Sequence, residues 1–239
     1  LCRSLHFGNA TRQSTMFLLE PSVLVLDYTR AMLAALLLDP EPARVLLLGL
    51  GGGSLPKFLL RHLPAVEIDA VELRADVIHV SQDLFELPLT PRLRVHEGDA
   101  LAYLRAHAGA PYDLVLVDVY VPTGIARVVE EREFFKALKG VSAPGAVVSL
   151  NLSRNERAGH RRSLRLLREV FAHRVLRLPV PGKGNDIALA VAPGATPGGD
   201  AGSLEARAQD LRARTGVEFT DFHRALQRDN RKVLRALFG

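Results

Sequence analysis

The middle of the chain alternates between short apolar runs and longer segments with helical spacing. Each apolar run has the length and continuity of a strand buried on both faces, whereas the longer segments place apolar residues every three or four positions. This alternation predicts a parallel sheet wound by helices over residues 44–152. The expected strands are 45–50, 66–72, 93–96, 114–118 and 146–152.

Polar residues and glycines indicate where helices begin and end. Ser54 is expected to cap the helix after the first strand, and Asp99 is expected to cap a helix over 100–107. Acidic residues from Glu130 and basic residues before Gly140 suit the two ends of another helix, because the helix dipole favours that arrangement.

The pattern changes after residue 170. Two apolar runs, 174–180 and 186–191, are separated by Pro181-Gly182-Lys183-Gly184-Asn185, which is too short for a crossover helix. They are therefore predicted to form an antiparallel hairpin. A mostly parallel seven-stranded sheet that ends in such a hairpin is typical of the Rossmann-like class I methyltransferase sandwich, an α/β fold. A nicotinamide-binding Rossmann domain usually continues with parallel units.

Three parts are expected along the chain. Residues 1–27 alternate weakly around Gly8-Asn9, a turn-favouring pair, and predict a short β-hairpin. Residues 28–194 would form the catalytic domain. Residues 195–239 would contain the end of a Gly- and Pro-rich connector and two short amphipathic helices. These helices are expected at 204–214 and 219–237.

Composition narrows the classes of protein. With 48% hydrophobic and 24% charged residues, the chain can build a substantial core. Its single cysteine, Cys2, excludes an internal disulfide and a thiolate metal cluster, and fits a reducing compartment such as the cytoplasm. No apolar run reaches the roughly 18 residues of a membrane-spanning helix, and no secretory segment opens the chain. We therefore expect a soluble protein with no membrane partner.

Charge is distributed unevenly. The first 150 residues carry 14 basic against 17 acidic side chains, and the remainder carry 17 against 9. A basic half could attract nucleic acid, but no stacking aromatic residues or RNA motif accompany it. The densest part, 154–170, has leucines at helical spacing, which favours the solvated face of an amphipathic helix. A nucleic-acid partner is not expected, although this pattern leaves it open.

A glycine-rich loop follows the first expected strand. Gly49, Gly51 and Gly53 belong to a Gly-Leu-Gly-Gly-Gly-Ser stretch between a strand and a helix. Without side chains, the loop lets a ligand approach the backbone, and free N–H groups at the helix start face it. The pyrophosphate of NAD and the amino-acid tail of S-adenosylmethionine both suit such a loop, and so does a tight turn without a ligand.

Acidic residues end the next strands. Glu72 lies 23 positions after Gly49, where a carboxylate can accept both hydroxyl hydrogens of an adenosine ribose. Asp99 can accept a hydrogen bond from an adenine amino group as well as cap its helix. Asp118 follows the fourth strand at the edge of the sheet where such folds bind ligands. A carboxylate there can hold an amine and accept its proton, so Asp118 is the catalytic candidate, with loop ordering as its structural alternative.

Other catalytic classes find little support. The eight histidines show no zinc-binding spacing, so no metal is expected, and the glycine loop is not the nucleophile elbow of a serine hydrolase. A sulfonium donor needs neither device, because its leaving group is already activated.

In order and spacing, these residues resemble the spermidine synthase-like family of polyamine aminopropyltransferases. The resemblance implies transfer of an aminopropyl group from decarboxylated S-adenosylmethionine to an amine such as putrescine, by a homodimer. The matching segments are Arg12-Gln13-Ser14, Tyr28, Gly49 to Ser54, Val71-Glu72, Gly98-Asp99-Ala100, Tyr112 to Pro122 and the final hairpin.

The same resemblance implies roles for individual residues. The implied nucleoside-sulfonium site contains Gln13, Glu72, Asp99 and Ala100. Asp118 would act on the amine, and Tyr28 and Tyr120 would border the acceptor pocket.

The chain departs from the family pattern at three places. Ser54 stands where the family usually has an Asp. In the family, that Asp faces the ammonium of the donor, and it repels the carboxylate of intact S-adenosylmethionine. Val121 replaces the second acid of the family's Asp-x-x-Asp-Pro sequence, and residues 30–31 offer Arg or Ala where Glu is usual. The alternatives are therefore a methyltransferase that uses intact S-adenosylmethionine on a small molecule or RNA, and a non-catalytic nucleoside-binding module. An NAD oxidoreductase is disfavoured by the closing hairpin.

Overall fold

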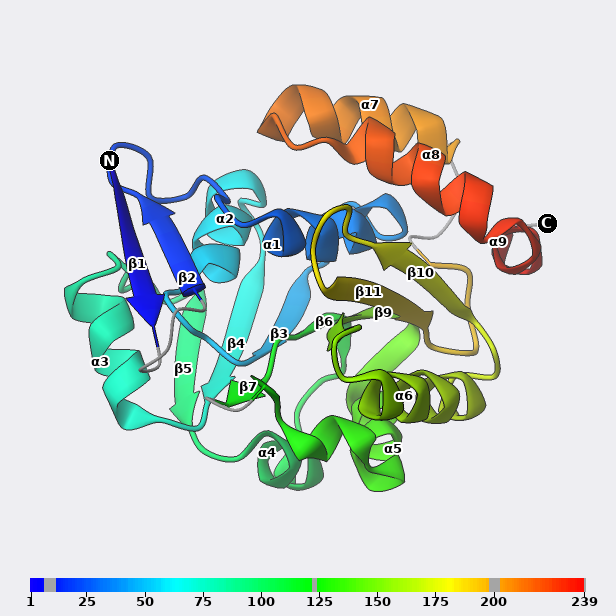
Figure 1. The fold of residues 1–239 in the computed structure, drawn as a ribbon, viewed down its shortest axis with the longest axis horizontal. Coiled ribbons are helices and arrows are strands. Elements are labelled where there is room, and N and C mark those ends of the chain that lie inside the picture. Colours follow the sequence, from blue (N-terminus) through cyan, green and yellow to red (C-terminus); the bar gives the residue numbers. More distant parts are fainter. Residues whose placement is uncertain (7–11, 122–123, 198–202, 239) are drawn as a thin grey trace.

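The computed structural model describes residues 1–6, 12–121, 124–197 and 203–238. The main sheet has seven strands: β3 (Arg44–Leu48), β4 (Glu67–Glu72), β5 (Leu93–Glu97), β6 (Tyr112–Val117), β9 (Ser142–Ser153), β10 (Val175–Pro179) and β11 (Asn185–Val191). Their order across the sheet is β10-β11-β9-β6-β3-β4-β5 (Figure 1). All predicted strands are present, and only their ends differ.

The order of strands reverses at the centre of the sheet. From β3 the chain builds outward through β4 to β5, and then returns to β6 on the other side of β3. All these pairs are parallel, so their carboxyl ends share one edge, and a crevice opens there between β3 and β6. β11 is antiparallel to both β9 and β10, which confirms the predicted closing hairpin and the class I methyltransferase-like fold.

Helices cover both faces because successive residues of a strand point to opposite sides. In β3, Val45 and Leu47 join one apolar cluster, and Leu46 and Leu48 join the other. The helical elements of the first layer are α1 (Asp27–Met32), η1 (Leu33–Leu37), α2 (Ser54–His62), α7 (Leu204–Thr215), α8 (Phe219–Asp229) and α9 (Arg231–Phe238). Those of the second are α4 (Ala100–Ala106), η2 (Arg127–Glu130), α5 (Arg132–Val141) and α6 (Arg157–Val170). The helix α3 (Ala75–Asp83) packs on β4 and β5.

The predicted start is correct for helix α4 but not for α2 or α5. Asp99 caps α4 as predicted, since its Oδ1 accepts a hydrogen bond of 2.8 Å from the N–H of Ala102. The prediction for Ser54 was wrong. Gly53, with a φ of 66°, takes the position before α2, and Ser54 becomes the first residue of the helix. Glu130 also lies outside α5, in the preceding turn η2.

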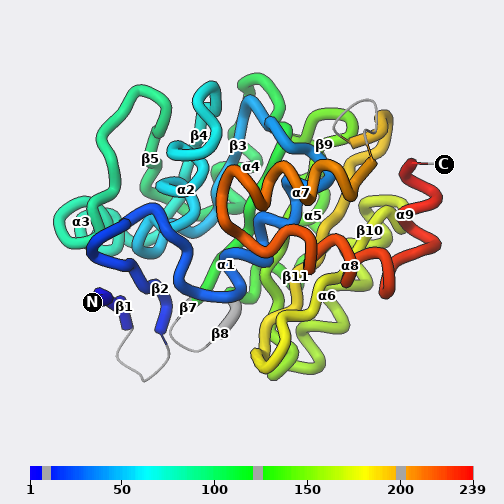
Figure 2. The backbone as a smooth tube through the Cα atoms, turned by 90° about the horizontal axis from the view of Figure 1, so that it is seen from above, coloured from blue at the N-terminus to red at the C-terminus, as the bar shows by residue number. Residues whose placement is uncertain are grey.

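The C-terminal region contains three helices where two were expected. Asn230 interrupts the second because its side chain docks on strand β10: its Oδ1 accepts from the N–H of Arg177 at 2.8 Å, and its Nδ2 donates to the Arg177 carbonyl at 2.9 Å. α8 therefore ends at Asp229, and α9 begins at Arg231. α7 and α8 both contact η1, and α8 also contacts β10, although these elements are far apart in sequence. Figure 2 shows α7 and α8 lying side by side.

Two small ribbons stand outside the main sheet. β1 (Cys2–His6) and β2 (Arg12–Phe17) form the antiparallel hairpin expected at the N-terminus, although the predicted Gly8-Asn9 turn lies outside the described residues. β7 (Tyr120–Val121) and β8 (Gly124–Ile125) form the second ribbon, directly after Asp118. Both ribbons lie near the carboxyl edge of the sheet (Figure 1).

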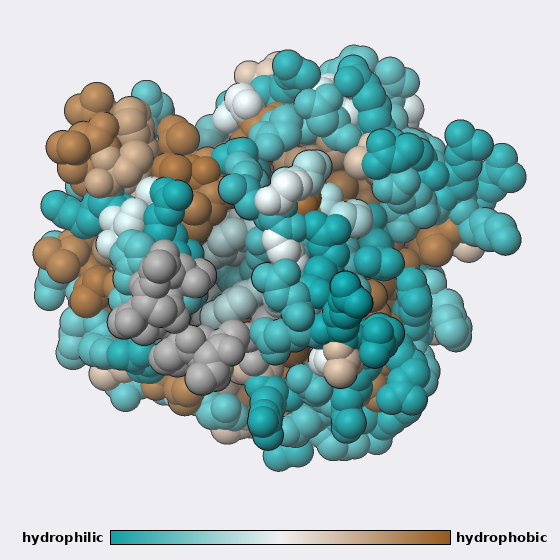
Figure 3. Space-filling view, viewed as in Figure 1, coloured by the Kyte–Doolittle hydropathy of each residue, from teal (hydrophilic) through white to brown (hydrophobic). Residues whose placement is uncertain are grey.

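The surface is polar over α6 and the C-terminal helices and more apolar around the N-terminal hairpin (Figure 3). In α6, leucines 164, 166 and 167 are buried while the arginines at 161, 162, 165 and 168 are exposed, which confirms the predicted amphipathic helix. No helix in the described parts of the chain is long and apolar enough to cross a membrane.

Candidate active site

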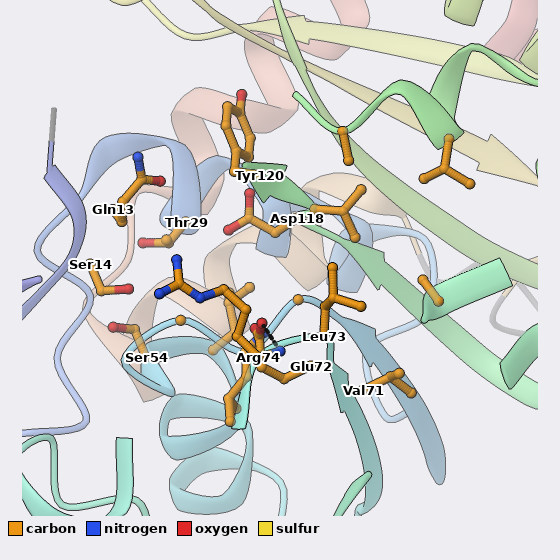
Figure 4. Close-up of a pocket in the computed structure, with 18 of the residues that line it drawn as sticks. Gln13, Ser14, Thr29, Ser54, Val71, Glu72, Leu73, Arg74, Asp118 and Tyr120 are labelled. Carbon is orange, nitrogen blue, oxygen red and sulfur yellow. Dashed lines mark hydrogen bonds between the residues drawn. The ribbon is translucent and has the colours of Figure 1, made fainter. Parts of the chain in front are cut away.

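A cavity lies at the carboxyl edge of the sheet, where the strand order reverses. It contains about 1070 Å³ of empty space, part of it open to solvent, and the loops after β3, β4, β5 and β6 line it together with β2 and α1. Figure 4 shows side chains from these separate elements surrounding the cavity. The predicted site residues in its lining are Gln13, Tyr28, Gly49, Gly51, Glu72, Asp99, Ala100, Asp118 and Tyr120.

Close packing of the backbone requires glycine at two positions of this loop. A Cβ on Gly49 would lie 2.2 Å from the carbonyl oxygen of Asp118, and the φ of Gly49 is 90°. One on Gly51 would lie 2.6 Å from the Ser14 hydroxyl, which also accepts a hydrogen bond from the N–H of Gly52 at 2.8 Å. Gly53 lies outside the cavity lining, against Leu87. The loop therefore packs against both β2 and the end of β6.

Glu72 connects the glycine loop to the end of β4. Its Oε2 accepts a hydrogen bond from the N–H of Leu50 at 2.9 Å, and its Oε1 accepts one from the N–H of Arg74 at 3.1 Å (Figure 4). A carboxylate oxygen can accept more than one hydrogen bond, so both oxygens keep capacity for a ligand. These contacts hold the carboxylate between loop and strand, at the floor of the cavity.

Asp118 is held by one hydrogen bond on each carboxylate oxygen. Tyr28 donates to Oδ2 at 3.1 Å, and Asn151 donates from Nδ2 to Oδ1 at 2.9 Å. Asn151 is in turn oriented by Asn185, whose Nδ2 donates to its Oδ1 at 3.0 Å. Burial raises the pKa of Asp118 above its ordinary value although both donors lower it, and the nearby charge of Glu72 raises it further. This carboxylate is therefore preorganised and more basic than a solvated aspartate.

Two tyrosines lie beside Asp118. Burial and the Asp118 charge raise the pKa of Tyr28 and of Tyr120, so both remain protonated phenols at neutral pH. The Tyr28 hydroxyl also lies 3.2 Å from the carbonyl oxygen of Gln13, which ties β2 to α1. Tyr120, on the strand that follows Asp118, lies beside that carboxylate, and its hydroxyl points away from it (Figure 4).

The far end of the cavity is more open. Asp99 is exposed, and its Oδ1 already caps α4. Its second oxygen has no hydrogen bond with another described residue, and Asp99 lines the cavity beside Ala100 and Gly98. The cap and a ligand contact are therefore compatible.

Several residues of the site were not assigned from sequence. Asn151, which donates to Asp118, is a buried polar residue in the mostly apolar strand β9, and that contrast was a usable signal. Ser14 belongs to one of the segments that match the family, but the sequence alone indicates no role for it. Thr29 and Arg74 carried no signal of their own; the Arg74 guanidinium is held by Asp76 through hydrogen bonds of 3.0 and 2.6 Å. In the described ranges, no three His, Cys, Asp or Glu side chains form a group that could hold a metal ion.

The fold and its edge cavity define a protein of the class I methyltransferase-like group. Solved structures with this fold include human methyltransferase-like protein 13 in complex with SAH, which is 27% identical with a TM-score of 0.67 and is matched over 87% of this chain and 93% of that chain. A probable spermidine synthase from Corynebacterium glutamicum is 22% identical with a TM-score of 0.69, over 88% of this chain and 79% of that one.

Within this group, the chain belongs to the spermine/spermidine synthase domain family, whose model matches residues 28–175. A polyamine aminopropyltransferase from Chromobacterium violaceum is 34% identical over 234 residues, which is 97% of this chain and 88% of the relative. The chain is thus homologous to transferase enzymes. These matches confirm the resemblance that the sequence motifs indicated.

Proposed function

We propose that the protein transfers an alkyl group from an adenosyl sulfonium donor to an amine. Aminopropyl transfer from decarboxylated S-adenosylmethionine to an amine such as putrescine is the first candidate, because it is the activity named for the family. The observation that carries the proposal is the Asp118 carboxylate, which Tyr28 and Asn151 hold next to the glycine loop at the open edge of the sheet.

The donor would lie across the carboxyl ends of β3, β4 and β5. Glu72 would accept the ribose hydroxyl hydrogens, and Asp99 would accept from the adenine amino group with Ala100 beside it. The tail would lie along Gly49 and Gly51, close to Gln13. This placement brings the sulfonium carbon toward Asp118.

In the transfer, the amine nitrogen attacks the carbon attached to sulfur. The N–C bond forms while the S–C bond breaks, and the bonding pair leaves with sulfur, which becomes a neutral thioether. Asp118 accepts the proton that the amine loses, because its raised pKa makes it a better base while Tyr28 and Asn151 keep it oriented. The active site therefore supplies position and a base, and the donor supplies the activated leaving group.

Methyl transfer from intact S-adenosylmethionine is the second candidate, and one observation favours it. Ser54 lines the cavity where the family carries an aspartate, and the cationic Arg74 lines the same cavity. A donor carboxylate would meet no acid at position 54, so repulsion between like charges would not exclude intact S-adenosylmethionine. The structural neighbour solved with SAH is named methyltransferase-like protein 13.

Calorimetric titration tests both candidates. Purified protein would be titrated with S-adenosylmethionine, its decarboxylated form, methylthioadenosine and NAD, and turnover with amines would be followed by the nucleoside product. Methylthioadenosine release supports aminopropyl transfer, whereas S-adenosylhomocysteine release supports methyl transfer. Asp118→Asn should bind the nucleoside normally but lose about 100-fold or more in kcat. Binding of NAD alone, or a fully active Asp118→Asn variant, would contradict the proposal.

A further inference from the structure

We propose that the acceptor of this enzyme carries an anionic group, a carboxylate, beside its reactive amine, in place of the second ammonium of a diamine. This inference rests on the proposed function and names the substrate class that the same site would take. It follows from a second cavity, which continues the first one past the catalytic carboxylate.

The second cavity shares Gln13, Leu26, Tyr28 and Tyr120 with the first. Its remaining wall includes Asn151, the residue that donates to Asp118. An acceptor whose amine reaches Asp118 would therefore extend the rest of its length into this second cavity. The charges on that wall decide which acceptors fit.

Two cations face this space. Arg12 lines it from the start of β2, where its backbone pairs with His6, and its guanidinium has no hydrogen bond or ion pair with a side chain in the described part of the chain. Lys183 lines it from the turn between β10 and β11, with its side chain 56% exposed. Arg154 donates hydrogen bonds to the carbonyl oxygens of Val180 and Lys183 and so holds that turn in place.

The acid in the wall is already neutralised. Asp27 also lines the cavity, but Arg30 donates to its Oδ1 at 2.6 Å, and Lys183 Nζ lies 3.7 Å from its Oδ2. Glu156 acts electrostatically on Tyr120 but lies outside the lining of this cavity. A second ammonium would thus meet Arg12 and a pair formed by Asp27 and Lys183, in which the carboxylate already has two cationic partners.

The neighbouring sequence adds no acid. Residues 119–121 and 124–129 contain no Asp or Glu. Like charges repel and opposite charges attract, so the wall disfavours a diamine and favours a carboxylate. Arg12 and Lys183 are both exposed to solvent, which limits the size of this preference. Arg12 and Lys183 are then specificity-determining residues for the acceptor.

Putrescine and 4-aminobutyrate form a matched pair for the test. Both have a primary amine on a four-carbon chain, and they differ in whether an ammonium or a carboxylate stands at the other end. Each would be titrated calorimetrically into the full chain saturated with methylthioadenosine, and each would be tried as acceptor with both donors. We expect 4-aminobutyrate to be favoured by about 10-fold in Kd, and in kcat/KM where turnover occurs.

Charge variants would test whether Arg12 and Lys183 cause the preference for 4-aminobutyrate. Arg12→Gln and Lys183→Gln should each weaken 4-aminobutyrate about three- to fivefold without changing nucleoside affinity. Lys183→Glu should move the preference toward putrescine. Lys139→Gln, an exposed lysine at the end of α5, serves as the matched control and should change nothing.

The outcomes separate the two proposals. Absence of nucleoside binding and of turnover would overturn the proposed function and this inference with it. Nucleoside binding with putrescine favoured over 4-aminobutyrate would overturn this inference alone. So would variants at Arg12 and Lys183 that leave the preference unchanged, or binding of neither amine.

Discussion

The hydroxyl of Tyr28 donates a hydrogen bond of 3.1 Å to Oδ2 of Asp118, although 90 positions separate the two residues in the chain. Tyr28 lies at the start of α1, and Asp118 directly follows β6. The contact joins the segment before the sheet to the centre of the site. It also stabilises the charged form of a buried carboxylate, and its removal has a defined consequence.

Tyr28→Phe should lower kcat/KM about 10-fold by removing that hydrogen bond. The bond lowers the pKa of Asp118, so its loss should raise that pKa further above the ordinary value. Since the base must be deprotonated, activity is lost as pH falls through this pKa. The acidic limb of the kcat/KM profile should therefore move to higher pH in the variant.

Tyr103→Phe is the control, because the Tyr103 hydroxyl bonds to that of Tyr112, away from the cavity. It should keep the wild-type acidic limb. If the limb of Tyr28→Phe coincides with that of the wild type, Tyr28 does not tune Asp118.

Glu72→Gln should weaken binding of methylthioadenosine. The variant loses the carboxylate charge that would face the ribose. In the wild type this carboxylate accepts hydrogen bonds from the N–H groups of Leu50 and Arg74. A hydrogen bond to a charged group contributes about 1.5–3 kcal/mol, so Kd should rise at least about 10-fold by calorimetry. Glu97→Gln, at the exposed end of the neighbouring strand, should bind like the wild type. Equal affinities for all three proteins would remove Glu72 from the nucleoside site.

Gly49→Ala should destabilise the fold as well as the site. Its Cβ would lie 2.2 Å from the backbone oxygen of Asp118, at a φ of 90° that alanine rarely adopts. We expect the free energy of unfolding to fall by about 2–4 kcal/mol in a urea titration. Gly140→Ala in helix α5, where a Cβ would have open space, should be neutral or stabilising. A Gly49→Ala protein as stable as the wild type would contradict the tight packing.

Asp69→Asn should destabilise the protein in a pH-dependent way. Burial alone would raise the pKa of Asp69, but hydrogen bonds from Arg94, His96 and Tyr112 outweigh it and lower the pKa to about 2, from 3.8. The carboxylate therefore stabilises the folded state by about 2 kcal/mol above pH ~4, and this contribution is lost as pH falls toward 2.

Urea titrations from pH 7 downward would measure the difference in free energy of unfolding between the wild type and Asp69→Asn. This difference, or gap, should become smaller below pH ~4, because protonation of Asp69 removes its stabilising contribution in the wild type. Glu67→Gln on the same strand, with its side chain half exposed, should show a much smaller gap. A gap for Asp69→Asn that stays constant down to pH 2 would contradict the depressed pKa.

The strands, the glycine loop and the acids after the strands were all predictable from the chain. Apolar runs report burial directly, and a strand followed by glycines and a helix indicates a loop that a ligand can approach. Helix boundaries were less predictable. Ser54 was expected as a cap but Gly53 occupies that position, and Asn230 ends a helix because it bonds to Arg177 on a distant strand.

The sequence by itself determined the layered α/β architecture and the acids along one edge, because periodicity and strand order depend on burial along the chain. Only the tertiary structure decided what surrounds Asp118. Tyr28, Asn151 and Lys183 come from separate parts of the chain, and packing of the sheet, α1 and the last hairpin brings all three to the second cavity, while Tyr28 and Asn151 both bond to Asp118. No local sequence pattern predicts this arrangement, because the arrangement depends on distances between elements and not on neighbours in the chain.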